Sequence, residues 1–153
     1  MNEINIYSTV KNGYKKLSNI LNGEVRAIIS NKPYTFKTVE HTYQCLKALY
    51  FNDFVTATKI LNSSTGWDAQ KLSKTIEIQN DKTLKDWDAI SKDVLEKCMR
   101  LCFEQNPKAL ELLLSTGDAK LIHDSDKHIN FGKWATIFPN ILMKIRDEHR
   151  INN

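Results

Sequence analysis

The stretch TVEHTYQCLKALYF, residues 38–51, predicts an amphipathic helix with two distinct faces, and the rest of the chain is organised around it. Apolar side chains recur there at spacings of four, three and four, so one face of the helix carries Val39, Tyr43, Leu46 and Tyr50. Glu40, Gln44 and Lys47 keep a similar rhythm on a neighbouring face, with His41 beside them. This polar line is either a solvated face with ordinary side-chain pairs or the wall of a site, and spacing alone leaves both open.

The bulk composition describes one folded domain. The chain has 153 residues, of which 41% are hydrophobic and 26% charged, with few glycines and prolines. Such a chain can bury a substantial core and is not disordered, so we expect a single domain over residues 1–153. The net charge of +4 is compatible with a phosphate-bearing ligand or nucleic acid but is too small to require either.

Targeting and cysteine signals indicate a cytoplasmic protein with no membrane partner. The longest apolar runs are far shorter than a membrane span, and the first residues lack a secretory layout. An odd count of three cysteines argues against a disulfide framework. Cys98 and Cys102 lie one helical turn apart, but both fall on an apolar stripe and no further pair of ligands completes a site. We therefore expect no metal.

The remaining sequence predicts short strands among several helices. Strand patterns occur at residues 4–8, 24–30, 34–37 and 119–123, with a turn at Asn31-Lys32-Pro33 that predicts a hairpin. Helical patterns occur at residues 53–61, at 67–74, from Asp86 or Asp88 to Gln105, from Pro107, and from Pro139 onward. The fold class that follows is α+β and mostly helical, with a small β-hairpin element.

Familiar catalytic motifs are missing from the sequence, which contains no phosphate loop, GxGxxG, HExxH or nucleophile elbow. What remains is a set of candidates on different elements: Glu40, Lys47, Trp87, and the aromatics near His123, Asp126 and His128. An acid, an aromatic ring and a basic residue can together hold a nucleotide-like ligand. The aromatic ring stacks on the flat ring of the ligand, the basic side chain contacts phosphate, and the carboxylate binds ribose or activates water. Trp87 can equally belong to the core, and the loop histidines can simply be exposed.

Several blocks of the chain match one family's motifs in the family's order. INIYST (residues 4–9) and LSNI (17–20) precede YTFKTVEHTYQCLKA (34–48), and a longer block (84–125), FG (131–132) and ILMKIRDE (141–148) follow. In this order the blocks resemble the NADAR (NAD- and ADP-ribose-associated) superfamily of YbiA-like N-glycosidases. The most specific match is residues 34–48, which resemble the family's W-x-T-x-E-H-x-x-Q-x-x-K.

The resemblance implies an enzyme that hydrolyses an N-glycosidic bond, without a cofactor. It suggests two substrate classes, early riboflavin-pathway intermediates and ADP-ribose attached to guanine. By this analogy Glu40 is the catalytic acid residue, stabilising charge on the ribose or activating water. Lys47 would face phosphate or the leaving group, and Trp87 would stack on base or ribose. The full set of substrate-binding residues that we expect is Ser18, Asn19, His41, Gln44, Lys47, Trp87, His128, Phe131 and Gly132.

The chain departs from the family's pattern near its C-terminal loop. The family's tryptophan before glycine is Phe131 here, which keeps a ring face but loses an indole N–H. An acidic residue usually precedes that pair, whereas this chain has His128, with Asp126 two residues earlier. Either Asp126 takes the second catalytic role or the site differs.

Our first hypothesis is removal of ADP-ribose from guanine in nucleic acid. The expected partners are an ADP-ribose-type nucleotide and ADP-ribosylated DNA, and the Lys-, Asn- and Ile-rich composition would suit a phage or mobile element that reverses DNA modification. The alternatives are an N-glycosidase for riboflavin intermediates, a non-catalytic ADP-ribose or NAD binder, and a helical interaction module. The sequence does not determine the oligomeric state.

Overall fold

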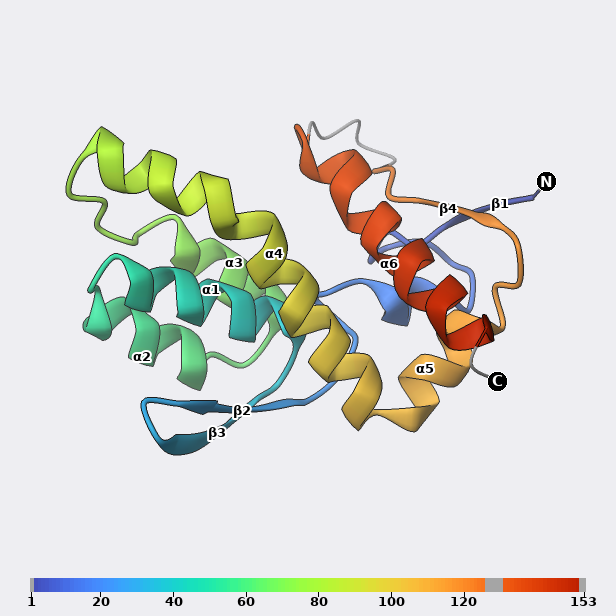
Figure 1. Ribbon diagram of the computed structural model, residues 1–153, viewed down its shortest axis with the longest axis horizontal. Helices are drawn as coiled ribbons and strands as arrows, with labels where there is room; N and C mark the ends of the chain where they lie inside the picture. Colours follow the sequence, from blue (N-terminus) through green and yellow to red (C-terminus); the bar gives the residue numbers. More distant parts are fainter. Residues whose placement is uncertain (1, 126–130, 152–153) are drawn as a thin grey trace.

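Helix α1 (Val39–Tyr50) lies between α2 (Phe54–Asn62) and α4 (Asp81–Gln105) in the left half of Figure 1, and three further helices pack against it. The computed structural model describes residues 2–125 and 131–151. The neighbours of α1 are α2, α3 (Gly66–Ser73) and the long α4. The other elements are β1 (Glu3–Asn5), η1 (Lys15–Leu17), β2 (Val25–Ile29), β3 (Lys32–Phe36), α5 (Pro107–Leu114), β4 (Lys120–Ile122) and α6 (Trp134–Ile151).

The start of α1 is fastened to the segment that precedes the hairpin. Thr38 is the N-cap, as predicted, and its Oγ1 accepts the amide of His41 at 3.2 Å. The amide of Val39 donates to Asn22 Oδ1 at 3.1 Å, and that of Glu40 donates to the carbonyl oxygen of Asn19 at 3.0 Å. These bonds satisfy amides that have no partner within the helix, and they hold residues 19–22 against its first turn.

Two small sheets flank the helices. The predicted hairpin is confirmed, with β2 and β3 antiparallel and Ile29 opposite Lys32. Its turn differs from the expected one: Ser30 and Asn31 take positive φ angles of 52° and 66°, and Pro33 lies within β3. At the opposite end of the molecule β1 pairs with β4 in parallel, with Ile4 opposite Leu121 (Figure 1).

Two helices begin earlier than the sequence predicts. Helix α4 starts at Asp81, because Asn80 Oδ1 caps it by accepting the amide of Thr83 at 2.8 Å. Helix α6 starts at Trp134 rather than at Pro139, which lies inside it. Proline at that position removes one backbone hydrogen bond and its ring crowds the carbonyl one turn earlier. Burial of apolar side chains such as Phe138 and Ile141 favours the longer helix despite this cost.

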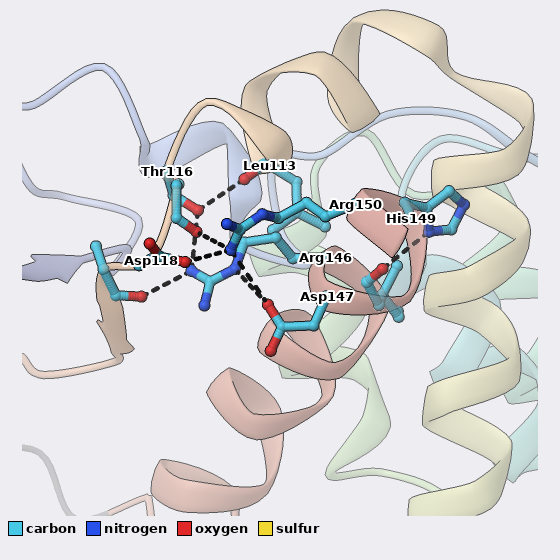
Figure 2. A network of polar contacts seen from close by, with 10 residues as sticks. Leu113, Thr116, Asp118, Arg146, Asp147, His149 and Arg150 are labelled. Atoms are coloured by element: carbon cyan, nitrogen blue, oxygen red, sulfur yellow. Dashed lines mark hydrogen bonds and ion pairs between the residues drawn. The ribbon is translucent and has the colours of Figure 1, made fainter. Parts of the chain in front are cut away.

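Helix α6 is tied to the turn between α5 and β4 by the nearly buried Arg146, which is 4% exposed. Its Nη1 donates to Thr116 Oγ1 at 3.1 Å and to the carbonyl oxygen of Ala119 at 2.7 Å, and its Nε donates to Asp147. Figure 2 shows this network together with the more exposed Arg150, which contacts Asp118. The polar network fixes the end of the turn from which β4 departs.

The core runs continuously between these elements. Its largest fully buried side chains are Ile6, Leu17, Phe36, Phe51, Ile60, Met99, Phe103, Leu113, Leu121, Ile141, Leu142 and Ile145. Cys98 and Cys102 are buried as well, which confirms the expected apolar stripe of their helix. The α+β, mostly helical class is likewise confirmed. Among the described helices, none combines the length and the apolar character needed to cross a membrane.

Candidate active site

A cleft of about 520 Å³ opens beside the first two turns of α1. Its lining combines polar side chains with several aromatic ones. The residues that line it are Tyr7, Ser8, Ser18, Asn19, Ile20, Glu40, Tyr43, Gln44, Trp67, Gln70, Ser73, Lys74, Leu95, His123, Phe131, Trp134 and Phe138. They come from the loops after β1 and η1, from α1, α3 and α4, and from the segments on both sides of residues 126–130. A cleft of this size can hold a ligand of nucleotide dimensions.

Glu40 is the only carboxylate among the described residues that line the cleft. Its side chain is 9% exposed, and burial raises the pKa of its carboxyl above the ordinary value. A hydrogen bond from Gln44 Nε2 to Glu40 Oε1 at 2.8 Å and the positive charge of Lys47 oppose that rise in pKa. A desolvated carboxylate with a raised pKa is suited to accepting a proton or facing a developing cation.

Gln44 lies one helical turn beyond Glu40 and is also 9% exposed. Because its amide nitrogen is engaged by Glu40, its oxygen Oε1 is left as an acceptor on a residue that lines the cleft. Within the described part of the chain this buried oxygen has no hydrogen-bond partner. An unsatisfied buried acceptor costs free energy, which a hydroxyl, amine or water bound in the cleft would recover.

An aromatic wall is built where the parallel strand pair ends. Tyr7 follows β1 and His123 follows β4, and their rings meet edge to face at 5.2 Å between centroids. Phe131 lies 4.7 Å from His123. Asn5 links the ends of β1 and β4. Its side-chain amide donates to the carbonyl oxygen of Asp124 at 2.8 Å, and its Oδ1 accepts the backbone amide of Asp124 at 3.1 Å. Burial lowers the pKa of His123 to about 4, so the imidazole is neutral at physiological pH.

Helix α3 and its C-cap residue contribute a further part of the lining, through Trp67, Gln70, Ser73 and Lys74. Lys74 is the only lysine or arginine among the described residues that line the cleft. The helix approaches the segment 18–20 very closely at Gly66. A Cβ atom at this position would lie 2.5 Å from the carbonyl oxygen of Ile20, which excludes any larger residue without movement of the backbone.

We therefore expect Gly66→Ala to destabilise the fold by about 1–3 kcal/mol, the usual cost of overpacking. The added methyl would push α3 away from Ile20 and hence from the residues beside Glu40. Urea unfolding followed by circular dichroism measures the change. Gly13→Ala is the matched control, since no heavy atom lies within 4 Å of a Cβ built there. Equal unfolding free energies for the two variants would contradict the prediction.

Comparison with known proteins shows which family has this sequence pattern. The family model described as the NADAR domain matches residues 6–136. The chain belongs to the NADAR family. The resemblance stated from the sequence is thereby confirmed, and the matched region contains every element that lines the cleft except the part of α6 beyond residue 136.

Two relatives and one solved structure show how far the NADAR likeness extends. N-glycosidase YbiA of Escherichia coli (strain K12) is 27% identical over 150 residues, covering 95% of this chain and 87% of its own length. N-glycosidase R617 of Acanthamoeba polyphaga mimivirus is 28% identical over 131 residues and 75% of each chain. The NMR structure of E. coli YbiA superposes with a TM-score of 0.74 at 25% identity, covering 99% of this chain and 86% of the other.

Five of the expected site residues meet at the cleft of this NADAR protein: Ser18, Asn19, Glu40, Gln44 and Phe131. The first two lie on the loop after η1, the next two on α1, and Phe131 just before α6. Gly132 is exposed beside Phe131, with a φ of 59° that favours glycine. Asp126 and His128 lie outside the described residues, so their roles stay predictions.

Trp87, which the resemblance suggests as a stacking residue, does not line the cleft. It is 3% exposed and packs in the core against Tyr43 and Tyr50, with ring centroids 5.7 and 5.3 Å apart. Trp87 therefore belongs to the core between α4 and α1, which is the alternative left open from the sequence, and it is not among the residues that line the cleft. Lys47 likewise does not line the cleft, although its charge acts on Glu40.

His41 is fully buried, does not line the cleft, and instead makes hydrogen bonds within the fold. Its Nε2 donates to the carbonyl oxygen of Ser63 at 3.2 Å, and its Nδ1 accepts from Thr38 Oγ1 at 2.8 Å. These contacts fit the neutral imidazole, and burial lowers the pKa of the side chain. His41 thus ties the cap of α1 to the end of α2.

Sequence reasoning missed most of the aromatic lining and the cation at its rim: Tyr7, Tyr43, Trp67, Lys74, Trp134 and Phe138. One signal was available. Trp67, Gln70 and Lys74 are spaced three and four apart, which places a tryptophan, an amide and an amine on one face of a short helix. The other residues meet through long-range packing that leaves no local pattern.

The cysteines take no part in the cleft. Burial raises the pKa of Cys45 and Cys102 to about 11 and that of Cys98 to about 12, so all three are thiols at neutral pH. Over residues 2–125 and 131–151, no three His, Cys, Asp or Glu side chains gather closely enough to hold a metal ion.

Proposed function

We propose that this protein is an N-glycosidase that hydrolyses the C1′–N bond of ADP-ribose attached to guanine in nucleic acid. Hydrolysis of an N-glycosyl bond is the activity named for its NADAR relatives. The observation that carries the proposal is the buried carboxyl of Glu40 beside the unpaired oxygen of Gln44, enclosed by aromatic side chains.

The chemistry of the bond suits this pair. Departure of the base leaves positive charge on the ribose ring, which the carboxylate of Glu40 stabilises. The same carboxylate can accept a proton from an attacking water. A water between Glu40 and Gln44 Oε1 can donate one hydrogen bond to each, because water has two O–H groups and both partners are acceptors.

The substrate class draws its support from the lining of the cleft. ADP-ribosylated guanine has two flat bases and two phosphates, whereas a ribosylaminopyrimidine intermediate has one ring and one phosphate. Aromatic side chains line the cleft from two separate places, Trp67 on α3 and the group around His123, and Lys74 adds a cation. The reversal of DNA modification for a phage or mobile element is part of this proposal.

The leaving base needs a proton. Asp126, which stands in the sequence between His123 and Phe131, is the residue that we propose for this second catalytic role. An acid there would complement Glu40, since glycoside hydrolysis commonly divides acid and base work between two carboxyl groups.

The test offers the purified protein two substrates, ADP-ribosylated DNA and the ribosylaminopyrimidine intermediates, with products identified by mass spectrometry. We expect free ADP-ribose and restored guanine from the DNA. Release of ribose phosphate from the pyrimidine intermediates alone would overturn the substrate class and favour the riboflavin-pathway alternative. Binding of ADP-ribose without turnover of either substrate would instead indicate a non-catalytic binder.

The pH dependence of this reaction should respond to Gln44. In Gln44→Met the amide N–H that stabilises the carboxylate is lost, so the pKa of Glu40 rises further. Because the reaction needs the ionised carboxylate, the acidic limb of the pH–rate profile should move to higher pH. Turnover at neutral pH should fall on the order of tenfold. An acidic limb that stays at its original pH in the variant would argue against the contact.

A further inference from the structure

One face of helix α3 is exposed and carries an aromatic ring, an amide and an amine in line. Trp67, Gln70 and Lys74 occupy positions i, i+3 and i+7, and all of them line the cleft. We name these three residues the α3 face. Trp67 is 44% exposed, although it is the largest apolar side chain of its helix, whose buried residues are Gly66 and Ala69.

The α3 face is held in a defined position relative to Glu40. Helix α3 begins with Thr65 as its N-cap and touches the backbone of Ile20 at Gly66, where only glycine fits. The preceding residue, Asn19, accepts the amide of Glu40 at 3.0 Å. Backbone contacts therefore lead from the amide of Glu40, through Asn19 and Ile20, to the first turn of α3. Trp67 lies at the end of the face nearest this link, and Lys74 lies about 10 Å further along the helix axis.

We propose that the α3 face is the subsite for the leaving base and the neighbouring phosphate: Trp67 stacks on the flat base attached at C1′, and Lys74 contacts the phosphate on the same ribose. This inference rests on the proposed function. The indole offers a ring face of the kind on which nucleobases stack, and Gln70 between the two residues can bond a base edge. The spacing of about 10 Å along the axis is comparable with the span from a base to its 5′-phosphate.

A second exposed lysine on α3, Lys71, allows Lys74 to be compared with a neighbour of the same charge. Lys71 lies on the same helix and is exposed, but it does not line the cleft. A general attraction of α3 for phosphate would involve both lysines. A subsite in the cleft would involve Lys74 alone.

The experiment measures the affinity of the full chain for two probes by calorimetry. Guanosine reports on the base, and ADP-ribose reports on the phosphate. Trp67→Ala should weaken guanosine binding on the order of tenfold, while Trp67→Phe, which keeps a flat ring, should stay close to the unmodified protein. Lys74→Gln should weaken ADP-ribose binding on the order of tenfold at low salt and leave guanosine unchanged, while Lys71→Gln changes neither.

Unchanged affinity in Trp67→Ala, or equal effects of Lys74→Gln and Lys71→Gln, would overturn the subsite. Since Trp67 and Lys74 are exposed, both variants should fold, and circular dichroism checks this. Turnover separates this inference from the function on which it rests. If the protein releases ADP-ribose from DNA but the variants keep its kcat/KM, the subsite fails and the function stands. If it releases none while the variants lose both probes as expected, the subsite stands and the function fails.

Discussion

Glu40→Gln should lower turnover by about 10²- to 10⁴-fold, the range that a general base contributes. The amide cannot accept a proton from water or balance positive charge on the ribose. It does keep an oxygen that can accept the hydrogen bond from Gln44 Nε2, so the side chain should hold its place. Single-turnover kinetics measures the loss, and calorimetry with ADP-ribose should show affinity close to that of the unmodified protein. Residual turnover within tenfold of the original would exclude Glu40 as the catalytic carboxylate.

The same variant should be more stable than the unmodified protein at neutral pH. Burial raises the pKa of Glu40, so the folded state favours the protonated carboxyl and is destabilised by its ionisation. The stability that the protonated group contributes is complete below the unfolded pKa and is lost as pH rises through the folded pKa. The advantage of glutamine should therefore appear at neutral pH and shrink in acid. Urea unfolding at several pH values checks the trend, and it also shows that lost activity is not lost folding.

Arg146→Ala should destabilise the fold by about 2–4 kcal/mol, because buried hydrogen bonds to a charged donor are lost and their acceptors remain buried. The acceptors are Thr116 Oγ1 and the carbonyl oxygen of Ala119, and the guanidinium that joins them is 4% exposed (Figure 2). Thermal and urea unfolding measure the change. Activity should fall as well, since the turn at Ala119 leads through β4 to His123 in the cleft wall.

Arg150→Ala is the matched control. Arg150 is one turn further along α6 and pairs with Asp118, but its side chain is 41% exposed. Water replaces such a contact readily, so its loss should cost less than about 1 kcal/mol. If the two alanine variants unfold at the same urea concentration, the network around Arg146 does not stabilise the fold in the way inferred here.

Local signals in the sequence were sufficient for the centre of the fold. Thr38 before a periodic segment predicted the start of α1, and the structure places the cap there because a cap needs contacts within one turn only. The spacing of Glu40 and Gln44 likewise predicted that they lie together, since residues four apart on a helix are neighbours. Whether that face met water could not be read from the helix, because the segments that bury it come from elsewhere in the chain.

Tertiary contacts decided what the sequence left open. Trp87 on α4 and Trp67 on α3 are both helical tryptophans, yet their exposed fractions are 3% and 44%. This difference in exposure could not be predicted from either helix alone, because it depends on where α3 and α4 pack against α1. The start of α6 was mispredicted for a related reason. Proline is frequent in the first turn of helices, and its presence inside α6 is made possible by burial of the surrounding apolar side chains.

The parallel pairing of β1 with β4 sets the order in which the molecule can be completed. Asn5 and Asp124, which lock the strands together, are 119 residues apart along the chain. Contacts of such high sequence separation have a large loop-closure entropy, which favours their formation after the helical layer has collapsed. Tyr7 and His123 meet only once that closure is made. We therefore expect the aromatic wall of the cleft to form late in folding, so that the carboxylate of Glu40 loses its last contact with water after the helices have packed.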